Sequence, residues 1–519
     1  MFETAELGRS IAKAEFKQMV PDLRQELLEL QDTLHKNKRF PVILIFAGVD
    51  GAGKGETVSL LNAWMDPRWL ITRAYDDDED GDWNWPEFWK YWRDLPPRGR
   101  IGMFLSAWYS RPLLDRVYGK SNDATFVNQL ERIVGFERAL ARDGALILKF
   151  WMHLSREEQE RRLTNLENDP LTAARVNKRD WEHWRMYDSF ISAAEQLVSR
   201  TNRGIAPWTV VEGTDSNYRS ITVAKILHDA IAHRLEEDQN NGAKNKTAAT
   251  GKKAKTKKGK QSRDAATTNG AAYQAARSIT VLSGLKMEQQ LSKVQYKERL
   301  IDLQARLHRM HLSAKSKNIA SVLVFEGPDA AGKGGAIRRI NAALDARNYQ
   351  VHGFSAPTEE ERARHYLWRF WRRVPSAGHV TIFDRSWYGR VLVERVEGFA
   401  TEDEWRRAYA EINDFEEQLN ESNTVLVKYW IHITEDEQLA RFKLREKTPY
   451  KRWKLTDEDW RNRDKWDIYE EAVNDMVQYT STSAAPWTLV EGNDKRFARI
   501  KVLETYCQRL SAALGEPAD

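Results

Sequence analysis

The stretch SVLVFEGPDAAGKG, residues 321–334, is the most informative part of this sequence. Its apolar run at 321–326 is typical of a buried β-strand, and a helical pattern follows at 334–346. Four residues carry the motif G-x-x-x-x-G-K and the position after it: Gly327, Gly332, Lys333 and Gly334. In this motif, backbone N–H groups and the start of a helix bind phosphate. A glycine-rich structural turn is the alternative, but the flanking strand and helix favour a phosphate-binding loop.

The same pattern occurs a second time near the N-terminus. VILIFAGVDGAGKG (42–55) repeats the strand and the loop, and its Lys54 lies 279 residues before Lys333. Four pairs of tryptophans keep the same separation: Trp89 with Trp368, Trp108 with Trp387, Trp151 with Trp430, and Trp208 with Trp487. A repeat of this length that occurs twice indicates two duplicated domains of about 230 residues each.

A basic segment separates the two copies. Residues 241–270 contain nine lysines and arginines against one aspartate, so they contribute +8 to a chain whose net charge is +5. Because the segment has no bulky apolar side chain, it cannot bury enough surface to offset the entropy lost on ordering. We predict a flexible linker at 236–285 between domains at 1–235 and 286–519. Recruitment of a polyanion by the linker's charge is the less favoured interpretation.

The composition excludes several classes of protein. Apolar residues make up 41% of the 519 residues, which is enough for large buried cores, so the chain is not disordered overall. The single cysteine, Cys507, excludes an intrachain disulfide framework and is typical of a reducing compartment. Apolar runs such as 41–49 are half the length of a membrane span, and the first residues lack the apolar core of a signal peptide. We therefore expect a cytoplasmic protein without a membrane partner.

Each copy alternates apolar runs with helical patterns. Helices are predicted at 21–36 and 291–312, before the first strand of each copy, and at 55–65 after the first loop. Further apolar runs that predict strands lie at 101–105, 145–152, 380–383 and 424–433. Strands that alternate with helices predict a parallel sheet covered on both faces. The expected fold is therefore α/β, with two tandem P-loop kinase-like domains of three α/β/α layers.

Two features of the loop indicate a metal ion. The residue after Lys333 is Gly334 and not Ser or Thr, so the hydroxyl that usually binds Mg²⁺ is missing. Asp329 lies inside the loop, where a carboxylate repels phosphates unless a cation lies between them or the carboxylate acts as a base. We therefore expect a metal ion held by carboxylates.

A second carboxylate is expected at Asp384. The apolar run before it resembles a Walker B strand, whose carboxylate holds Mg²⁺ near the loop. Arg385 and Arg390 follow, and planar guanidinium groups suit phosphoryl oxygens with developing charge. A strand end with a surface ion pair is the alternative interpretation of Asp384 and Arg385.

Further basic residues surround these motifs. Arg362, Arg369 and Arg373 have near i, i+4 spacing that predicts one helix face, with a solvated basic face as the alternative. Five more lie on a predicted helix and in the loop after it: Arg441, Arg445, Lys451, Arg452 and Lys454. Several basic clusters around one phosphate loop indicate a substrate with many phosphates. Lys428 and His432 recur in the N-terminal copy, so we interpret them as structural.

The two copies keep their packing residues but differ in their charged residues. Neutral residues of the N-terminal copy replace charged ones of the C-terminal copy: Leu105 for Asp384, Ser106 for Arg385, Thr172 for Lys451, Ala173 for Arg452, Ser216 for Lys495 and Ser220 for Arg499. The acidic run at 76–80 would also repel a polyanion. These changes remove most of the charge stabilisation that phosphoryl transfer needs. We therefore predict that the C-terminal copy catalyses and that the N-terminal copy is degenerate and inactive.

Five motifs of the C-terminal copy together resemble the polyphosphate kinase 2 family: GPDAAGKGG, DRSWYGR, KYWIHI, PYKRWKLTDEDW and APWTLVEGNDKRFAR. Both copies resemble this family, and the tandem arrangement is similar to its two-domain subgroup. The resemblance implies a P-loop kinase fold and Mg²⁺ as cofactor. It also implies transfer of the terminal phosphoryl group of inorganic polyphosphate to AMP, which gives ADP.

The resemblance also implies roles for individual residues. Asp329 and Asp384 would organise Mg²⁺, and Asp329 is also a candidate to activate the acceptor phosphate. Lys333 and Arg385 would neutralise the transferring group. Basic residues in a lid and near the loop would bind the donor or the acceptor: Arg390, Arg441, Arg445, Lys451, Arg452, Lys454, Lys495 and Arg499.

The residues alone leave alternatives open. The same fold could act on nucleoside diphosphates, or the protein could be an ATP-dependent nucleotide kinase, although the missing hydroxyl after Lys333 counts against ATP. The least favoured alternative is a non-enzymatic protein that binds polyanions through its basic linker. We expect no nucleic-acid partner, and the oligomeric state stays open, a homo-oligomer included.

Overall fold

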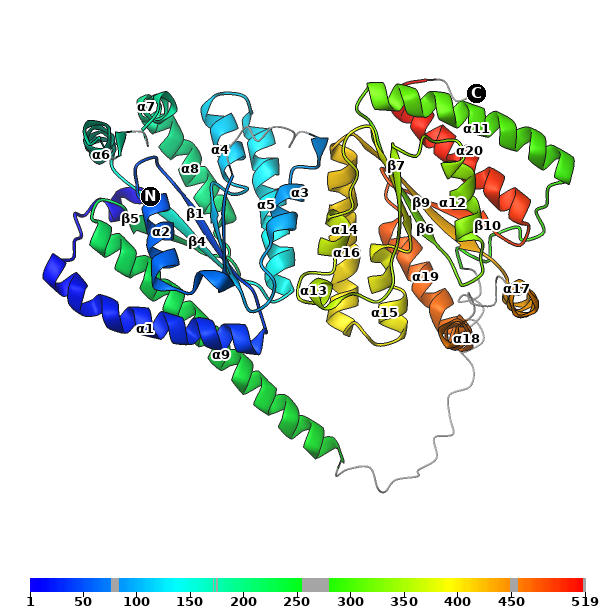
Figure 1. Cartoon of the computed structure of the whole chain (residues 1–519), viewed down its shortest axis with the longest axis horizontal. Coiled ribbons are helices and arrows are strands. Elements are labelled where there is room, and N and C mark those ends of the chain that lie inside the picture. The colour runs from blue at the N-terminus through cyan, green and yellow to red at the C-terminus, as the bar shows by residue number, and fades with distance from the viewer. Residues whose placement is uncertain (76–83, 171, 174–175, 254–279, 449–455, 517–519) are drawn as a thin grey trace, which may run out of the picture. The chain divides into compact units, whose positions relative to one another are not determined.

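The computed structural model describes residues 1–75, 84–170, 172–173, 176–253, 280–448 and 456–516. They fall into two compact units, one built mainly from the N-terminal copy and the other mainly from the C-terminal copy. Each unit contains one five-stranded parallel sheet with helices on both faces (Figure 1). The predicted pair of tandem α/β domains is confirmed.

The sheet of the N-terminal unit has the strand order β2-β3-β1-β4-β5. Its strands are β1 (Val42–Gly48), β2 (Leu70–Ala74), β3 (Ile101–Leu105), β4 (Leu146–His153) and β5 (Trp208–Glu212). Its helices are α1 (Lys13–Asn37), α2 (Lys54–Trp64), α3 (Trp89–Asp94), α4 (Ser110–Val117), α5 (Asp123–Arg142), α6 (Arg156–Asn168), α7 (Lys178–Arg185), α8 (Tyr187–Thr201) and α9 (Ser216–Lys253), with short 3₁₀ turns η1 (Phe2–Ala5) and η2 (Pro67–Trp69). Helices α1, α2 and α9 pack together on one face, and α4, α5 and α8 pack on the other (Figure 1).

The C-terminal unit repeats this topology, with the strand order β7-β8-β6-β9-β10. Its strands are β6 (Ala320–Glu326), β7 (Tyr349–Gly353), β8 (Val380–Asp384), β9 (Thr424–His432) and β10 (Trp487–Glu491). Its helices are α11 (Lys293–Ser316), α12 (Lys333–Asn341), α13 (Glu359–Arg362), α14 (Trp368–Trp371), the 3₁₀ turn η5 (Trp387–Arg390), α15 (Val393–Val396), α16 (Glu402–Glu421), α17 (Glu435–Lys447), α18 (Asp457–Asp464), α19 (Trp466–Thr480) and α20 (Lys495–Leu514). Helices α11, α12 and α20 pack together on one face, and α16 and α19 lie on the other (Figure 1).

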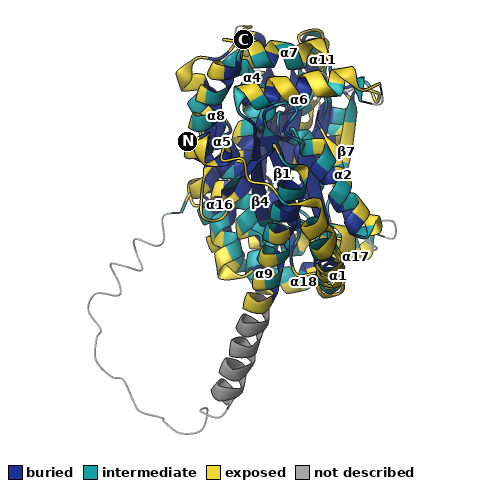
Figure 2. Cartoon of the chain, turned by 90° about the vertical axis from the view of Figure 1, so that its left-hand side faces the viewer, coloured by how far each residue is buried: buried dark blue, intermediate teal, exposed yellow. Residues whose placement is uncertain are grey.

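The central strands form because their side chains are apolar on both faces. All seven residues of β6 are buried, and so are six of the seven residues of β1, which lies inside its unit in Figure 2. A strand covered on both sides needs such a continuous apolar run. The edge strands β2 and β7 are partly exposed, and their mixed sequences did not predict strands.

The register of the parallel strands brings the two predicted carboxylate motifs together. Phe325 in β6 lies opposite Asp384 in β8, so the loop after β6 and the turn after β8 leave the same edge of the sheet side by side. In the N-terminal unit, Phe46 lies opposite Leu105 in the same way. Ligands of open α/β sheets bind at this carboxyl edge.

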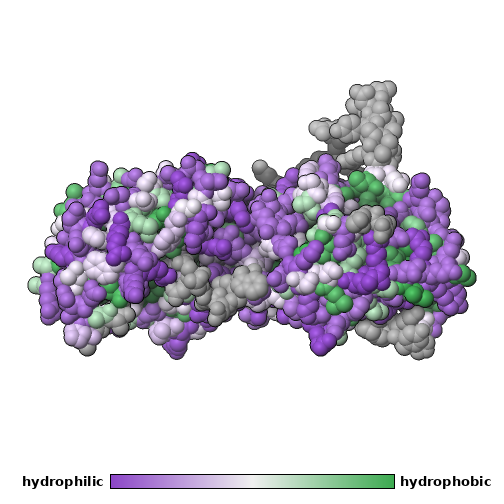
Figure 3. Space-filling view, turned by 90° about the horizontal axis from the view of Figure 1, so that it is seen from above, coloured by the Kyte–Doolittle hydropathy of each residue, from purple (hydrophilic) through white to green (hydrophobic). Residues whose placement is uncertain are grey.

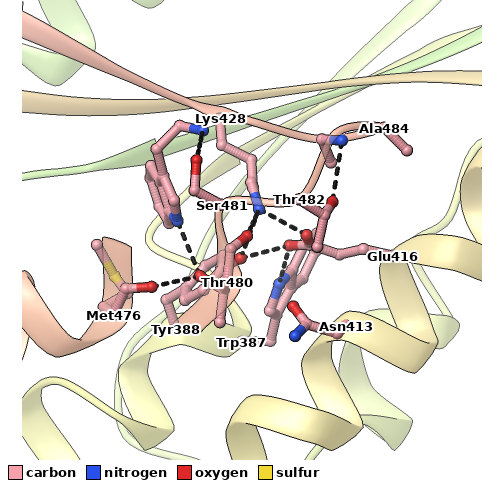
Figure 4. A network of polar contacts seen from close by, with 12 residues as sticks. Trp387, Tyr388, Asn413, Glu416, Lys428, Met476, Thr480, Ser481, Thr482 and Ala484 are labelled. Atoms are coloured by element: carbon pink, nitrogen blue, oxygen red, sulfur yellow. Dashed lines mark hydrogen bonds and ion pairs between the residues drawn. The ribbon is translucent and has the colours of Figure 1, made fainter. Parts of the chain in front are cut away.

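A buried polar network holds the turn after β8 against the sheet (Figure 4). Lys428 Nζ lies 2.7 Å from Glu416 Oε2, and Tyr388 Oη and Trp387 Nε1 donate to Glu416 Oε1 at 2.7 and 3.0 Å. Lys428 also donates to the carbonyl of Thr480 at 2.6 Å. The N-terminal unit has the same network, with Lys149, Glu137, Tyr109, Trp108 and Thr201. The structural role that we predicted for Lys428 is confirmed.

Two helix ends predicted from the sequence differ from the structure. Helix α9 continues to Lys253, inside the predicted linker, because 236–253 contain several strong helix formers such as Glu, Gln, Lys and Ala. Helix α12 ends at Asn341, since Asp345 accepts a hydrogen bond from the N–H of Arg347 at 2.9 Å, which stabilises a turn instead. The rest of the linker up to residue 279 lies outside the described residues.

The predicted basic helix around Arg369 is two short helices, α13 and α14, separated by a turn. Arg362, Arg369 and Arg373 therefore do not share one helix face. The reason is aromatic packing, because Trp368, Phe370 and Trp371 are buried. Arg369 lies over the rings of Phe354 and Phe370, at 4.7 and 5.1 Å from their centroids.

The face shown in Figure 3 is mostly hydrophilic over the described residues, and small hydrophobic patches are scattered on it. No helix in the described part of the chain combines the length and the apolarity needed to cross a bilayer.

Candidate active site

The phosphate-binding loop of the C-terminal unit joins β6 to α12. Gly327 has a φ of +147° and Gly332 has a φ of +114°, which glycine adopts without strain. A Cβ atom at Gly327 would lie 2.4 Å from the carbonyl oxygen of Ile431, so the loop cannot accept a side chain there. Lys333 begins α12, and its Nζ donates to the carbonyls of Gly327 and Pro328 at 2.6 and 3.4 Å. The loop and its lysine therefore adopt a compact phosphate-loop arrangement.

Gly334 follows the lysine in a different environment. A Cβ atom at Gly334 would have no other atom within 4 Å. Packing therefore does not prevent a serine or threonine at this position. The missing hydroxyl leaves carboxylates as the expected metal ligands of this site.

Asp329 lies at the centre of the site and is bound from three sides. Arg385 Nη2 lies 2.7 Å from its Oδ1, and Asn462 Nδ2 from α18 donates to its Oδ2 at 3.0 Å. Gln438 Nε2 donates to its backbone carbonyl at 3.1 Å. Burial alone would raise the pKa of Asp329, but the positive charges of Lys333 and Arg385 lower it below its usual value. Asp329 is therefore ionised and paired with Arg385.

Arg385 reaches Asp329 because of the turn after β8. Its φ is +65°, in the left-handed region, and its N–H donates to the carbonyl of Phe325 at 3.1 Å. Non-glycine residues in this region cluster at functional sites. Asp384 is the last residue of β8 and precedes this turn directly. The structure thus brings together Asp329, Lys333 and Arg385, with Asp384 at the neighbouring strand end.

The carboxylates of this site would hold Mg²⁺ together with substrate phosphates and waters. The described residues contain no group of three or more His, Cys, Asp or Glu that could hold a metal by themselves. Mg²⁺ commonly binds through one or two carboxylates together with substrate phosphates and waters. Asp384 suits this role, and each oxygen of the Asp329 carboxylate accepts one contact, from Arg385 and from Asn462, which leaves further acceptor sites on both oxygens.

Arg441 differs from the role that we predicted for it. It is 5% exposed, and its guanidinium donates to four backbone carbonyls at 2.7 to 2.9 Å: those of Ala330, Ala331, Gly492 and Asn493. Its Nε also bonds Glu437 at 2.6 Å. With all its donors bound inside the protein, Arg441 holds the phosphate loop in place and is not presented to a substrate.

The other predicted basic residues are placed as follows. Arg390 lies over the Tyr366 ring at 4.5 Å and 3.2 Å from Glu394, so it is also bound within its unit. Arg499 on α20 points its guanidinium at the first turn of α12, 3.3 Å from the position of a Cβ at Gly335. Arg445 is in the last turn of α17, and Lys495 is the exposed first residue of α20. Three residues of the predicted lid lie outside the described residues: Lys451, Arg452 and Lys454.

Sequence reasoning missed Asn462 and Glu326. Asn462 corresponds to His183 of the N-terminal copy, and Glu326 corresponds to Ala47. Glu326 is buried at the end of β6, directly before the loop, where it accepts hydrogen bonds from Ser386. Burial raises the pKa of Glu326 above its usual value, while the bonds from Ser386 and the nearby positive charges oppose that rise. The difference between the two copies at these two positions is the sequence signal that identifies them as candidates.

The loop of the N-terminal unit has the same backbone but different chemistry. Lys54 Nζ donates to the carbonyls of Gly48 and Val49 at 2.6 and 2.9 Å, as Lys333 does in the other unit. Asp50 is bound by His183 at 2.6 Å. No arginine corresponds to Arg385, because Ser106 occupies that position.

A carboxylate of the protein itself lies at this second loop. Glu56, in the first turn of α2, bonds Arg162 at 2.5 Å and Arg219 at 2.7 Å. Arg219 covers the loop so closely that a Cβ at Gly53 would lie 2.2 Å from its guanidinium carbon. The C-terminal unit has Gly335 at the position of Glu56. The helix start that favours an anion is thus already paired with a negative charge in the N-terminal unit.

Comparisons with known proteins agree with this duplicated site. The profile of the family described as Polyphosphate kinase 2 (PPK2) matches residues 10–239 and 290–516, one match for each copy. A protein of Pseudomonas syringae pv. tomato named Polyphosphate:AMP phosphotransferase is 47% identical over 515 residues, 99% of both chains. A protein of Pseudomonas aeruginosa with the same name is 48% identical over 513 residues, again 99% of both chains.

One further relative matches one half of this chain, and one solved structure matches the whole chain. NDP-polyphosphate phosphotransferase 2 of Ruegeria pomeroyi is 41% identical over 233 residues, 44% of this chain and 68% of that one. The crystal structure of a putative polyphosphate kinase 2 from Pseudomonas aeruginosa matches with a TM-score of 0.85 and 46% identity over 100% of both chains. The family profile matches both copies, and two full-length relatives are 47% and 48% identical to this chain. The chain therefore belongs to the polyphosphate kinase 2 family.

Proposed function

We propose that this protein transfers the terminal phosphoryl group of inorganic polyphosphate to AMP, forming ADP, and that the reaction takes place in the C-terminal unit with Mg²⁺. The observation that carries the proposal is the cluster of Asp329, Lys333 and Arg385 beside Asp384, which occurs at one of the two loops. Full-length relatives with both units are named polyphosphate:AMP phosphotransferases, which supports AMP as the acceptor.

The chemistry needs charge neutralisation more than a base. An oxygen of the AMP phosphate forms a bond to the terminal phosphorus of polyphosphate, and the bond from that phosphorus to its bridging oxygen breaks. The second pKa of a phosphate monoester is about 6, so the attacking oxygen is already ionised at neutral pH. Lys333 and Arg385 offset the charge that develops on the transferring group, and positioning supplies the rest.

Asp384 and Asp329 have different roles in this proposal. Asp384 is the residue that would hold Mg²⁺, which supplies further positive charge to the phosphates when it is bound. Asp329 fixes the guanidinium of Arg385 at 2.7 Å, beside the phosphate loop. Arg441 keeps the loop rigid through its carbonyl contacts.

The N-terminal unit is a degenerate copy in this proposal. Glu56 supplies an internal anion at its loop. Leu105 and Ser106 stand where the C-terminal unit has the carboxylate for Mg²⁺ and the arginine that neutralises the transferring group. A phosphate chain would have to displace Arg162 and Arg219 from Glu56 before it could bind there. The unit therefore serves the protein without turnover of its own.

One assay tests the proposed reaction. The purified full-length chain is mixed with Mg²⁺ and long-chain polyphosphate, and AMP, GMP, ADP and GDP are offered separately, with ATP as an alternative donor to AMP. We expect ADP from AMP and polyphosphate, and loss of the reaction after chelation of Mg²⁺. Products are separated by ion-exchange chromatography. Turnover of ADP or GDP without turnover of AMP would replace this proposal with a diphosphate acceptor, and ATP as the better donor would replace polyphosphate.

A non-enzymatic role of the basic linker makes a different prediction. Deletion of 241–270 would abolish function if the linker bound the polyanion, whereas the proposed enzyme keeps its rate of turnover. The same assay decides between the two.

A further inference from the structure

A second buried carboxyl group lies between the phosphate loop and the turn that carries Arg385. Glu326 ends β6 and is 5% exposed, and Ser386 follows Arg385 and is 4% exposed. The N–H and the Oγ–H of Ser386 both donate to Glu326 Oε1, at 2.8 Å each. Ser386 Oγ in turn accepts a hydrogen bond from the N–H of Tyr388 at 3.3 Å. This pair joins the end of β6 to the turn after β8 by side chains.

The N-terminal copy shows that the backbone turn does not require this pair. Ala47 and Ala107 stand in place of Glu326 and Ser386. Ser106 nevertheless has a φ of +51°, and its N–H donates to the carbonyl of Phe46 at 3.4 Å, as Arg385 does to Phe325 at 3.1 Å. The left-handed turn thus forms in both copies, whatever the side chains around it.

The pair of Glu326 and Ser386 differs from the packing residues of the same turn, because the N-terminal copy lacks it. The network of Glu416 and Lys428 recurs in the N-terminal unit as Glu137 and Lys149, with the same 2.7 Å contact. The pair of Glu326 and Ser386 occurs in the copy that also has Asp384 and Arg385, and the other copy has none of the four. Residues needed for the fold persist in both copies, whereas this pair follows the phosphoryl-transfer residues.

We propose that Glu326 is a positioning residue that, through Ser386, restrains a turn that forms without it, so that the guanidinium of Arg385 is held at Asp329 beside the phosphate loop. This inference rests on the proposed function, because Arg385 is the group that it positions. The contact that it maintains is the 2.7 Å pair of Arg385 and Asp329. An error of about 1 Å in placing such a group can lower a rate ~100-fold.

The N-terminal copy suggests the variant that tests this inference. Glu326→Ala combined with Ser386→Ala recreates the pair Ala47 and Ala107, which the same fold already accommodates. We expect kcat for ADP formation to fall ~10- to 100-fold, with an unchanged melting temperature. Glu326→Gln keeps an amide oxygen where Oε1 accepts both bonds, so it should retain most of the wild-type kcat.

A double-mutant cycle separates positioning from a general effect. In the Arg385→Ala background, the two alanine replacements should lower kcat no further, because the group that they position is absent. Glu137→Gln changes the equivalent buried carboxyl group of the N-terminal unit, so it is the control and should lower the melting temperature without coupling to Arg385. An unchanged kcat in the double-alanine variant, or additive losses with Arg385→Ala, would overturn the inference.

The outcome stays separate from that of the proposed function. If the wild-type chain forms no ADP from polyphosphate and AMP, the proposed function fails. The same cycle is then measured on the binding of tripolyphosphate by titration calorimetry, which needs no turnover. Coupling between Glu326 and Arg385 in the dissociation constants would support the inference, and independent effects would reject it.

Discussion

Asp384→Asn should lower kcat for ADP formation at least ~100-fold, as expected when one charged stabiliser of the transition state is lost. Asp384 ends β8 opposite Phe325, so it lies at the strand end beside the phosphate loop. The neutral amide would hold Mg²⁺ weakly and would leave more of the phosphate charge uncompensated. The N-terminal copy, which has Leu105 at this position, already lacks that carboxylate.

Initial rates with saturating polyphosphate and AMP measure this effect, over a titration of Mg²⁺. Asp403→Asn is the matched control, because Asp403 is an exposed residue in the first turn of α16. It should keep the wild-type rate. A rate for Asp384→Asn close to that of the control would remove Asp384 from the account of the site.

Lys428→Met should cause the largest loss of stability. It leaves the carboxyl group of Glu416 buried without its ion-pair partner, and breaking a buried pair costs ~3–5 kcal/mol. Burial already raises the pKa of Glu416, and Lys428 is the main opposing influence, so the variant carboxyl group should take up a proton. For a unit of this size, the loss corresponds to about 10 °C in Tm.

Scanning calorimetry of the full chain measures this change as a shift of one unit's unfolding transition. Lys149→Met removes the equivalent lysine of the N-terminal unit and should shift the other transition instead. Addition of Glu416→Gln to Lys428→Met should recover part of the loss, since the amide is neutral without the cost of taking up a proton at neutral pH. An unchanged Tm for Lys428→Met would show that the network does not stabilise the unit.

The parts of the fold that local sequence dictates could be predicted. The apolar run of β6, the glycines of the loop and the position of Asp384 at the end of β8 are local patterns, and the structure places them as expected. The edge strands β2 and β7 could not be predicted, because partly exposed strands carry polar residues that resemble loops. Their pairing depends on the neighbouring strand and not on their own composition.

The site was harder to predict because contacts between distant residues decide it. Arg441 has the composition of a substrate-binding residue, yet its donors are used by carbonyls of two distant loops. Asn462 and Glu326 act through partners 133 and 60 residues away, which no local pattern announces. The comparison of the two copies predicts the site best, since it identifies which positions differ together between them.

The equivalent lysines of the two loops give the most direct test of the central claim, that one copy of the duplicated site carries the reaction. Lys333→Ala and Lys54→Ala remove the same contact to the loop carbonyls in the two units. Formation of ADP from polyphosphate and AMP is measured for both variants of the full chain. We predict that Lys333→Ala lowers kcat at least ~100-fold, whereas Lys54→Ala keeps the wild-type rate. Loss of turnover in Lys54→Ala with retained turnover in Lys333→Ala would contradict the account.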